Sequence, residues 1–297
     1  MIDLTIIIVS YNTKEFLKKC LESVKNAALK FNYEIIVIDN NSSDSSLEML
    51  GKEFPDVFLI KNKKNLGFSK ANNQGIKKAR GRYLLFLNPD TIVNKDTLPT
   101  LIEFMEGNKE VGVSTCKLIM PNGKIDDACH RGFPTPWNAF CHFLGISKIF
   151  PKIKLFSGYS LSYLDFDESH EIDACAGAFM LVRREAGEKI GWWDEDYFFY
   201  GEDLEFCFRL KELGYKIYYV PDVYTLHYKG ISGGIKKISK NISTADKKTR
   251  RLATNARFNA MKIFYKKHYL EKYPKFITWL VMQGINFKLR TSLKMIN

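Results

Sequence analysis

The stretch from Tyr83 to Thr91, YLLFLNPDT, constrains the fold more than any other part of the chain. Its five consecutive apolar residues predict a strand buried on both faces, as in a parallel sheet. Asn88 and Pro89 form a turn signal that leaves Asp90 just beyond the strand's carboxyl end. Ligands of open α/β sheets collect at that edge, where an Asp could hold a divalent cation. The alternative is that Asp90 caps a helix beginning near Lys95.

Strands and helices are predicted to alternate around this stretch. Strands are expected over 4–9, 34–38, 57–60, 83–87, 111–116, 178–182 and 215–220. Helices are expected over 14–25, 47–54, 71–79, 98–105, 204–213 and 247–270, with a short helical piece over 187–190. This order predicts a doubly wound α/β fold, with a mostly parallel central sheet and helices on both faces.

Residues 119–170 have no clear periodicity. Their aromatic loop at 133–137 could line an acceptor pocket or pack in the core.

The chain has no glycine-rich phosphate-binding motif. Neither G-x-G-x-x-G after the first strand nor G-x-x-x-x-G-K-[ST] is present, so a nucleotide would bind without such a cradle. Asp39, at the end of the second predicted strand, could accept hydrogen bonds from a base or a ribose. The alternative is a turn residue, because the run from Asp39 to Ser43 favours turns.

The segment 192–205 interleaves six acidic with six aromatic residues, which is typical of a cleft wall rather than of a solvated charge run. Glu202 and Asp203 fall at the start of a predicted helix, where carboxylates also stabilise the helix end. His227 follows a later strand in a predicted loop. Although a lone His is more often structural, Asp90 and His227 could converge at one sheet edge as ligands of a manganese-like ion.

The net charge of +12 is concentrated in the tail. From Lys229 onward the chain has 17 Lys and Arg against two acidic residues, whereas the part before Lys229 is nearly neutral. Such a basic block can bind nucleic acid or anionic lipid, or can be a solvated face. The six cysteines form no C-x-x-C pair and indicate reduced thiols, hence a cytosolic protein. We expect no signal peptide before the first strand and no spanning helix, since the apolar run 276–282 is too short.

Several blocks, taken as an ordered set over about residues 3–232, resemble the inverting glycosyltransferases of family 2, which have the GT-A fold, and above all their rhamnosyltransferase-like branch. The blocks are TIIIVSYN at 5–12, IIVIDNNSSD at 35–44, NLGFSKANNQGI at 65–76, LLFLNPDT at 84–91, GAFMLVRR at 177–184, YGEDLEFCFRL at 200–210, and HYKG with Ser232 at 227–232. The resemblance implies a GT-A catalytic domain over 1–232. Its nucleotide-sugar half is expected over about 1–118, its acceptor half over about 119–232, and a basic helical extension over 233–297.

The resemblance also implies roles for individual residues. Nucleotide-sugar contacts are expected at Ser10, Tyr11, Asn12, Asp39, Asn65, Gly67, Asn72, Asn88 and Asp90. Tyr11 and Asp39 correspond to base contacts, and Asn72 to a position near the diphosphate. Asp90 matches the last acid of the family's Asp-x-Asp metal motif, in which Asn88 replaces the first acid, and His227 matches a ligand of the divalent metal, Mn²⁺ or Mg²⁺.

Asp203 matches the catalytic base, with Glu202 beside it. Asp173, Trp193 and Asp194 are expected on the acceptor side.

The implied reaction moves a sugar, with rhamnose favoured, from a nucleoside-diphosphate sugar to a hydroxyl of a glycan or lipid-linked glycan in cell-surface polysaccharide synthesis. The favoured donor is dTDP-rhamnose, with UDP-sugars next. A sugar-nucleotide nucleotidyltransferase is the first alternative, but residues 1–20 lack the Gly and Arg of its signature. A nucleic-acid-binding protein using the basic tail is the second, but the tail has no recognised motif, and we expect no nucleic-acid partner.

The tail is expected to attach the protein to the cytoplasmic face of an anionic membrane. In the predicted helix 247–270, Phe258, Met261, Tyr265 and His268 recur at helical spacing among Lys and Arg, and an apolar stretch with Trp279 follows. Cations with an interfacial Trp are typical of a membrane-surface helix. The alternative is that the apolar face packs on the catalytic domain or on a second subunit of a homo-oligomer.

Overall fold

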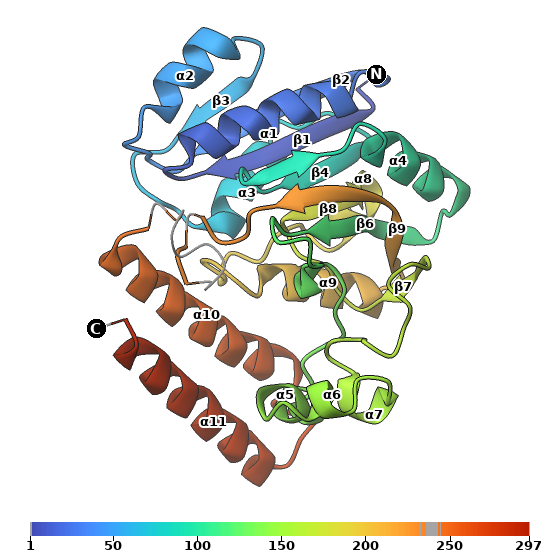
Figure 1. Ribbon diagram of the computed structural model, residues 1–297, viewed down its shortest axis with the longest axis vertical. Coiled ribbons are helices and arrows are strands. Elements are labelled where there is room, and N and C mark those ends of the chain that lie inside the picture. Colours follow the sequence, from blue (N-terminus) through green and yellow to red (C-terminus); the bar gives the residue numbers. More distant parts are fainter. Residues whose placement is uncertain (1, 232, 236–242, 244, 297) are drawn as a thin grey trace.

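The computed structural model describes residues 2–231, 233–235, 243 and 245–296, so Ser232 of the HYKG block lies outside the described residues. The predicted doubly wound α/β fold is confirmed: a nine-stranded sheet has the order β3-β2-β1-β4-β8-β6-β9-β5, and β7 also pairs with β9 (Figure 1). The strands are β1 (Leu4–Ser10), β2 (Tyr33–Asp39), β3 (Phe58–Lys61), β4 (Tyr83–Leu87), β5 (Thr91–Val93), β6 (Val111–Ile119), β7 (His170–Ile172), β8 (Phe179–Arg183) and β9 (Lys216–His227).

Strands β1 to β4, β6 and β9 run in one direction, whereas β5, β7 and β8 run in the opposite direction. The predicted central strand is β4, whose five side chains are all buried because β1 and β8 pair with its two sides and helices cover both faces. Its carboxyl end therefore delivers Asn88 and Asp90 to the edge at which β1 and β2 also end.

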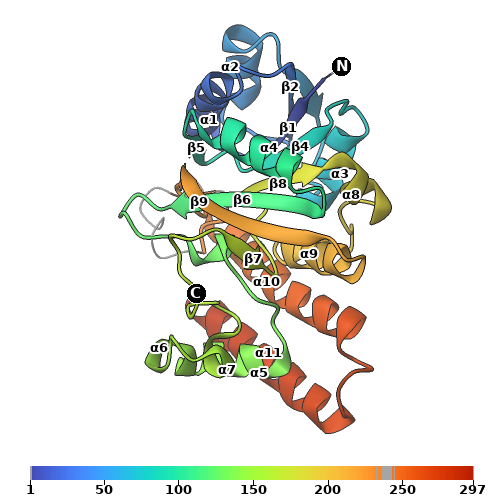
Figure 2. The same ribbon diagram turned by 90° about the vertical axis from the view of Figure 1, so that its right-hand side faces the viewer.

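Helices cover both faces of the sheet, as α1 and α3 on opposite sides of β1 and β4 show (Figure 2). α1 forms because Leu17, Cys20, Leu21 and Val24 recur at helical spacing and are buried together. The helices are α1 (Lys14–Ala27), α2 (Ser46–Glu53), α3 (Phe68–Ile76), α4 (Thr97–Gly107), the 3₁₀ helix η1 (Asp127–Cys129), α5 (Pro136–Phe143), α6 (Ile146–Ile149), α7 (Lys154–Ser157), α8 (Arg184–Lys189), α9 (Glu202–Glu212), α10 (Lys247–His268) and α11 (Lys275–Lys294).

One alternative and one boundary prediction around the site are wrong. The alternative that Asp90 caps a helix fails, since the short strand β5 follows it and Asp96 is the N-cap of α4. The last strand does not end at Val220 before Pro221 but continues to His227, so His227 lies in β9 rather than in a loop. A bulge explains the difference: the register with β6 jumps from Val220 to Tyr224, which leaves the proline outside the ladder.

The aperiodic region and the apolar tail stretch are also more helical than predicted. Residues 119–170 contain η1 and the short helices α5 to α7. The stretch 276–282 is part of the 20-residue helix α11. Among the helices of the described ranges, none combines the length and hydropathy needed to cross a bilayer.

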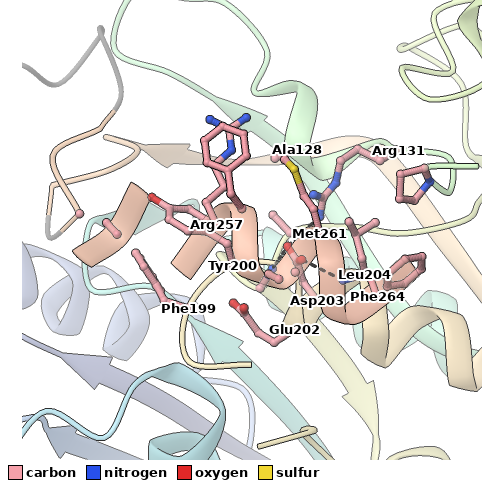
Figure 3. Close-up of a pocket in the computed structure, with 18 of the residues that line it drawn as sticks. Ala128, Arg131, Phe199, Tyr200, Glu202, Asp203, Leu204, Arg257, Met261 and Phe264 are labelled. Atoms are coloured by element: carbon pink, nitrogen blue, oxygen red, sulfur yellow. Dashed lines mark hydrogen bonds and ion pairs between the residues drawn. The ribbon is translucent and has the colours of Figure 1, made fainter. Parts of the chain in front are cut away.

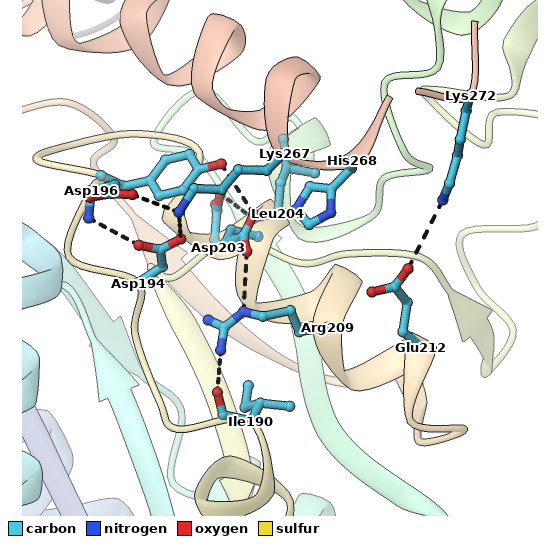
Figure 4. Close-up of polar contacts among 12 residues, drawn as sticks. Ile190, Asp194, Asp196, Asp203, Leu204, Arg209, Glu212, Lys267, His268 and Lys272 are labelled. Atoms are coloured by element: carbon cyan, nitrogen blue, oxygen red, sulfur yellow. Dashed lines mark hydrogen bonds and ion pairs between the residues drawn. The ribbon is translucent and has the colours of Figure 1, made fainter. Parts of the chain in front are cut away.

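The predicted tail helix, α10, packs on the catalytic domain. Its Phe264 and Tyr265 are buried in a small apolar cluster with Tyr197 and Phe208, the latter on α9. Polar contacts surround this cluster: Lys267 Nζ lies 2.5 Å from Asp194 and 2.7 Å from Asp196, and His268 Nε2 contacts Glu205 (Figure 4). The apolar face of α10 is thus occupied, as the packing alternative proposed.

We predict that Phe264→Ala lowers the free energy of unfolding by about 3–5 kcal/mol, because the truncation leaves a cavity between α9 and α10. Leu270→Ala, at an exposed position just after α10, is the matched control and is expected to change it by less than about 0.5 kcal/mol. Urea unfolding followed by tryptophan fluorescence measures both. Equal effects of the two substitutions would show that α10 is not docked as the structure has it.

Candidate active site

A cavity of about 1220 Å³ lies beyond the carboxyl ends of the parallel strands. Loops that follow β1, β2 and β4 line one end of it, and α10 and α11 line the other. In Figure 3, Arg257 and Met261 of α10 face the same pocket as Glu202 and Asp203 of α9. The tail helices and the sheet edge therefore enclose one space.

Asp90 and His227 meet at one end of the cavity, because β5 pairs with β9 and sets Thr91 opposite His227. Asp90 Oδ1 lies 3.5 Å from His227 Nε2, and Asp126 Oδ2 accepts a hydrogen bond from His227 Nδ1 at 2.9 Å. Lys229 pairs with the other oxygen of Asp126. Asp90, Asp126 and His227 are all buried.

The charges in this cluster compensate one another. Burial opposes the charge of His227, but Asp90 and Asp126 raise the pKa of His227 to about 9. Burial likewise opposes ionisation of Asp90, yet the nearby charge of His227 holds the pKa of Asp90 below its ordinary value. The two carboxylates therefore favour positive charge at this position.

The residues at this position fit a divalent cation. His227 Nε2 is buried without a hydrogen-bond partner, while Nδ1 is held by a carboxylate, the usual arrangement of a metal-ligating His. Within the described ranges, no group of three or more His, Cys, Asp or Glu is placed to hold a metal. A cation held by Asp90 and His227 would therefore take its remaining ligands from a diphosphate and water.

Glu202 and Asp203 begin α9 on the opposite wall, just after Gly201, whose φ of +82° makes the turn into the helix. Arg131 Nη2 lies 2.7 Å from Asp203 Oδ2, and this carboxylate raises the pKa of Arg131 although burial opposes the charge. Burial, and then the charge of Asp203, raise the pKa of Glu202 to about 8. At neutral pH Glu202 is therefore mostly protonated.

The predicted nucleotide-sugar residues divide into two groups. Tyr11, Asn65, Gly67, Asn88 and Asp90 line the cavity.

Ser10, Asn12, Asp39 and Asn72 are not among its lining residues and are held by neighbours. The hydroxyls of Ser10 and Thr13 share a hydrogen bond, and Asn12 accepts a hydrogen bond from Ser43 N. Asn72 donates a hydrogen bond to Phe68 O, and Asp39 Oδ2 accepts one from Ser42 N. Asp39 Oδ1 is nevertheless buried without a partner, which leaves one acceptor for a ligand.

The backbone at position 67 requires a glycine, whatever its role in binding. Its φ is +83°, and a Cβ there would lie 2.4 Å from Phe198 O, the atom to which Phe68 N donates a hydrogen bond.

The three predicted acceptor residues do not line this cavity. Trp193 is only 2% exposed and packs edge-on against Phe68 and Phe86 in the core. Asp173 pairs with Lys211, and Asp194 pairs with Lys267 of α10. The aromatic and acidic segment is thus only partly a cleft wall: Phe198 to Leu204 face the cavity, and its beginning packs inward.

Sequence reasoning missed Asp126, Arg131 and Arg257. Asp126 and Arg131 lie in the aperiodic region, where no pattern marks a functional residue. Arg257 lies on α10, which was predicted to face a membrane. Only the topology reveals them, because each reaches the cavity from a segment remote in sequence.

Comparisons with known proteins show the family of the chain. The model of the family described as glycosyl transferase family 2 matches residues 5–191. The chain is 34% identical over 232 residues to rhamnosyltransferase WbbL of Escherichia coli (strain K12), covering 75% of this chain and 82% of that protein. It is 28% identical over 226 residues to the poly-beta-1,6-N-acetyl-D-glucosamine synthase of Staphylococcus aureus (strain COL), covering 73% of this chain and 48% of that protein. The chain thus spans about half of that synthase.

Solved structures share the fold at low identity. The mannosyltransferase PcManGT from Pyrobaculum calidifontis, in complex with GDP-Man and Mn²⁺, has a TM-score of 0.54 at 15% identity, covering 99% of this chain and 89% of that one. GalNAc-T7 with UDP, GalNAc and Mn²⁺ has a TM-score of 0.56 at 20% identity, covering 76% and 44%. With the family match, these likenesses show that the chain belongs to glycosyl transferase family 2 and is a glycosyltransferase with the GT-A fold.

Proposed function

We propose that the protein transfers a sugar, with rhamnose favoured, from a nucleoside-diphosphate sugar to a hydroxyl of a glycan or lipid-linked glycan, in cell-surface polysaccharide synthesis and with inversion at the anomeric carbon. The observation that carries this proposal is that one cavity joins two sets of side chains. Asp90 and His227 lie at one wall, and Glu202 and Asp203 at another. Inverting transfer needs these two functions, a site for the leaving diphosphate and a base for the acceptor.

The donor binds along the loops that follow β1, β2 and β4. Asp39 Oδ1, which has no hydrogen-bond partner, and the ring of Tyr11 recognise the base. Asn72 is assigned to the neighbourhood of the diphosphate. The named rhamnosyltransferase relative supports rhamnose, and hence dTDP-rhamnose, as donor. UDP-sugars come next.

Asp90 and His227 would hold Mn²⁺ or Mg²⁺. The bound cation would act as a Lewis acid and neutralise the charge that develops on the leaving diphosphate. Asp126 accepts a hydrogen bond from Nδ1 of His227 and thereby leaves Nε2 as the nitrogen that could bind a ligand, and Lys229 keeps Asp126 ionised by pairing with it.

Asp203 accepts the proton of the acceptor hydroxyl, whose oxygen attacks the anomeric carbon as the bond to the diphosphate breaks. Glu202 is unsuited to this role at neutral pH, because the pKa of about 8 leaves it mostly protonated. Arg131 orients the Asp203 carboxylate through its 2.7 Å contact. A single displacement of this kind requires no covalent enzyme intermediate.

The organisation of the chain follows from the proposal. Residues 1–232 form the catalytic domain, with the donor half over about 1–118 and the acceptor half over about 119–232, and 233–297 form the extension whose α10 closes the cavity. The enzyme acts at the cytoplasmic face of the membrane, where its acceptor is anchored.

We expect dTDP-rhamnose to raise the melting temperature most in a thermal-shift screen of nucleotide sugars with manganese, and UDP-sugars less. A ligand at 100 times its Kd stabilises the folded state by about 2.7 kcal/mol, which such a screen resolves. A larger shift with a UDP-sugar would overturn the rhamnose assignment and leave the transferase class intact.

Asp203→Asn is expected to lower turnover by about 10²–10⁴-fold without weakening donor binding, because it removes the base and keeps the shape. Glu202→Gln is the matched control: the native side chain is already neutral, so turnover should stay within about tenfold. Initial rates of nucleoside-diphosphate release and titration of the donor separate the two effects. An Asp203→Asn enzyme that stays within a few-fold of wild type would refute the base assignment.

Asp90→Ala and His227→Ala should each weaken nucleoside-diphosphate binding in manganese and change it much less in EDTA, because they remove ligands of the cation. Asp126→Asn should lower manganese affinity by about 10–100-fold through the loss of the carboxylate behind His227. Asp96→Ala, at the exposed N-cap of α4, is the control. Isothermal titration with and without EDTA measures all four, and EDTA-insensitive binding by the native protein would exclude this site as a metal site.

A further inference from the structure

Two segments remote in sequence expose large apolar side chains at the same end of the molecule. On α11, Phe276, Trp279 and Phe287 are 61–65% exposed. On the segment from α5 to α7, Leu144, Ile149 and Leu155 are 62–69% exposed. Figures 1 and 2 both place these helices together at the end opposite α2, and Lys288 of α11 lies 5.8 Å from the ring centre of Phe143 on α5.

The charge of both segments has one sign. Residues 128–164 and 272–297 contain no Asp or Glu. The described part of these segments exposes Lys148, Lys152, Lys154, Lys272, Lys275, Lys288, Arg290 and Lys294. Lys272 lies 4.0 Å from Glu212. None of the other seven cations forms an ion pair with a carboxylate among the described residues. Clustered apolar side chains mixed with unpaired cations are the composition of surfaces that lie in the headgroup region of a bilayer.

The two faces of α11 differ. Ile277, Val281 and Ile285 turn toward the cavity, and among the described residues of the helix only Ile285 is buried. Phe276, Leu280, Gln283 and Phe287 follow one another at helical spacing and are exposed, although Leu280 and Phe287 also border the cavity, and Arg290 and Lys294 continue this stripe. The stripe is therefore apolar over its first turns and cationic over its last.

We propose that α5 to α7 and α11 together form a docking face that seats the protein on an anionic lipid bilayer. Charge complementarity selects this occupant over a second copy of the chain. A two-fold dimer through this face would bring seven cations against the same seven, with no carboxylate in either segment to compensate them. Anionic headgroups supply the missing negative charge, and the acyl region takes the aromatic and aliphatic side chains.

The face adjoins the candidate active site. Phe143 of α5 and Leu280 and Phe287 of α11 line the cavity that also contains Asp203. A bilayer under this face would present a lipid-linked acceptor at the cavity. That consequence rests on the proposed function, whereas the docking itself does not.

The test is sedimentation of the full chain with phosphatidylcholine vesicles of rising phosphatidylglycerol content, without nucleotide sugar. Truncation before α10 is unsuitable because it would uncover Tyr197 and Phe208. Two double variants are used instead, Phe276→Ser/Trp279→Ser on α11 and Ile149→Ser/Leu155→Ser on α6 and α7. The matched control is Leu29→Ser/Phe58→Ser, which changes side chains 74% and 51% exposed outside both segments.

The native protein and the control should pellet with anionic vesicles at low salt and be released at high salt. Each double variant should lower the partition coefficient by at least about tenfold, given the apolar area withdrawn from the lipid. If the α11 variant lost binding and the variant on α6 and α7 did not, the proposal that both segments form the docking face would be wrong. Binding unchanged in both variants, or a dimer in analytical ultracentrifugation that both variants dissociate, would overturn the proposal. Because no donor is present, none of these outcomes depends on glycosyl transfer.

Discussion

The buried pairing of His227 with Asp90 and Asp126 is the interaction that holds the candidate site together. It joins three segments: the end of β4, the start of η1, and the end of β9. A buried charge is costly unless it is paired, so each of these groups requires the other two. The register of β5 with β9 and the bulge around Pro221 both serve to bring His227 to this position. The sheet is thus regular where it forms the core and irregular where it meets the cavity.

Glu202 and Asp203, the second pair of carboxyl groups in the site, are neighbours in sequence but have different surroundings. Glu202 and Asp203 are adjacent on α9, yet Asp203 faces Arg131 while Glu202 is buried beside another negative charge. The same helix start therefore presents two carboxyl groups in different surroundings, and at neutral pH Glu202 is mostly protonated. The arrangement depends on Arg131, a residue from the aperiodic region before α5.

The fold could be predicted from the sequence because apolar runs and helical spacing are local signals. The run over 83–87 and the spacing of Leu17, Cys20, Leu21 and Val24 each identify their element directly. The convergence of Asp90 and His227 could also be predicted, since the sequence places both near the ends of strands of one sheet, although His227 is the last residue of β9 and does not follow it.

The rest depends on contacts that a single sequence does not encode locally. Nothing near Trp193 distinguishes a cleft aromatic from a core one, and the structure packs it against Phe86. The partner of His227 at Nδ1 lies 101 residues away along the chain. The tail helix α10 has the composition of a membrane-surface helix, but Phe208 on α9 provides a partner for its apolar face.

The position of α10 has a consequence for how the protein is made. Residues of α10 line the same cavity as the loops that follow β1 and β4, so one wall of the candidate site comes from a helix that follows every strand of the sheet in sequence. A ribosome adds about 5–20 residues per second and domains form from the N-terminus. The sheet can therefore pair while the cavity is still open on the side of α9. The nascent enzyme acquires a closed site only after α10 has left the ribosome, so the sheet can form before the site is enclosed.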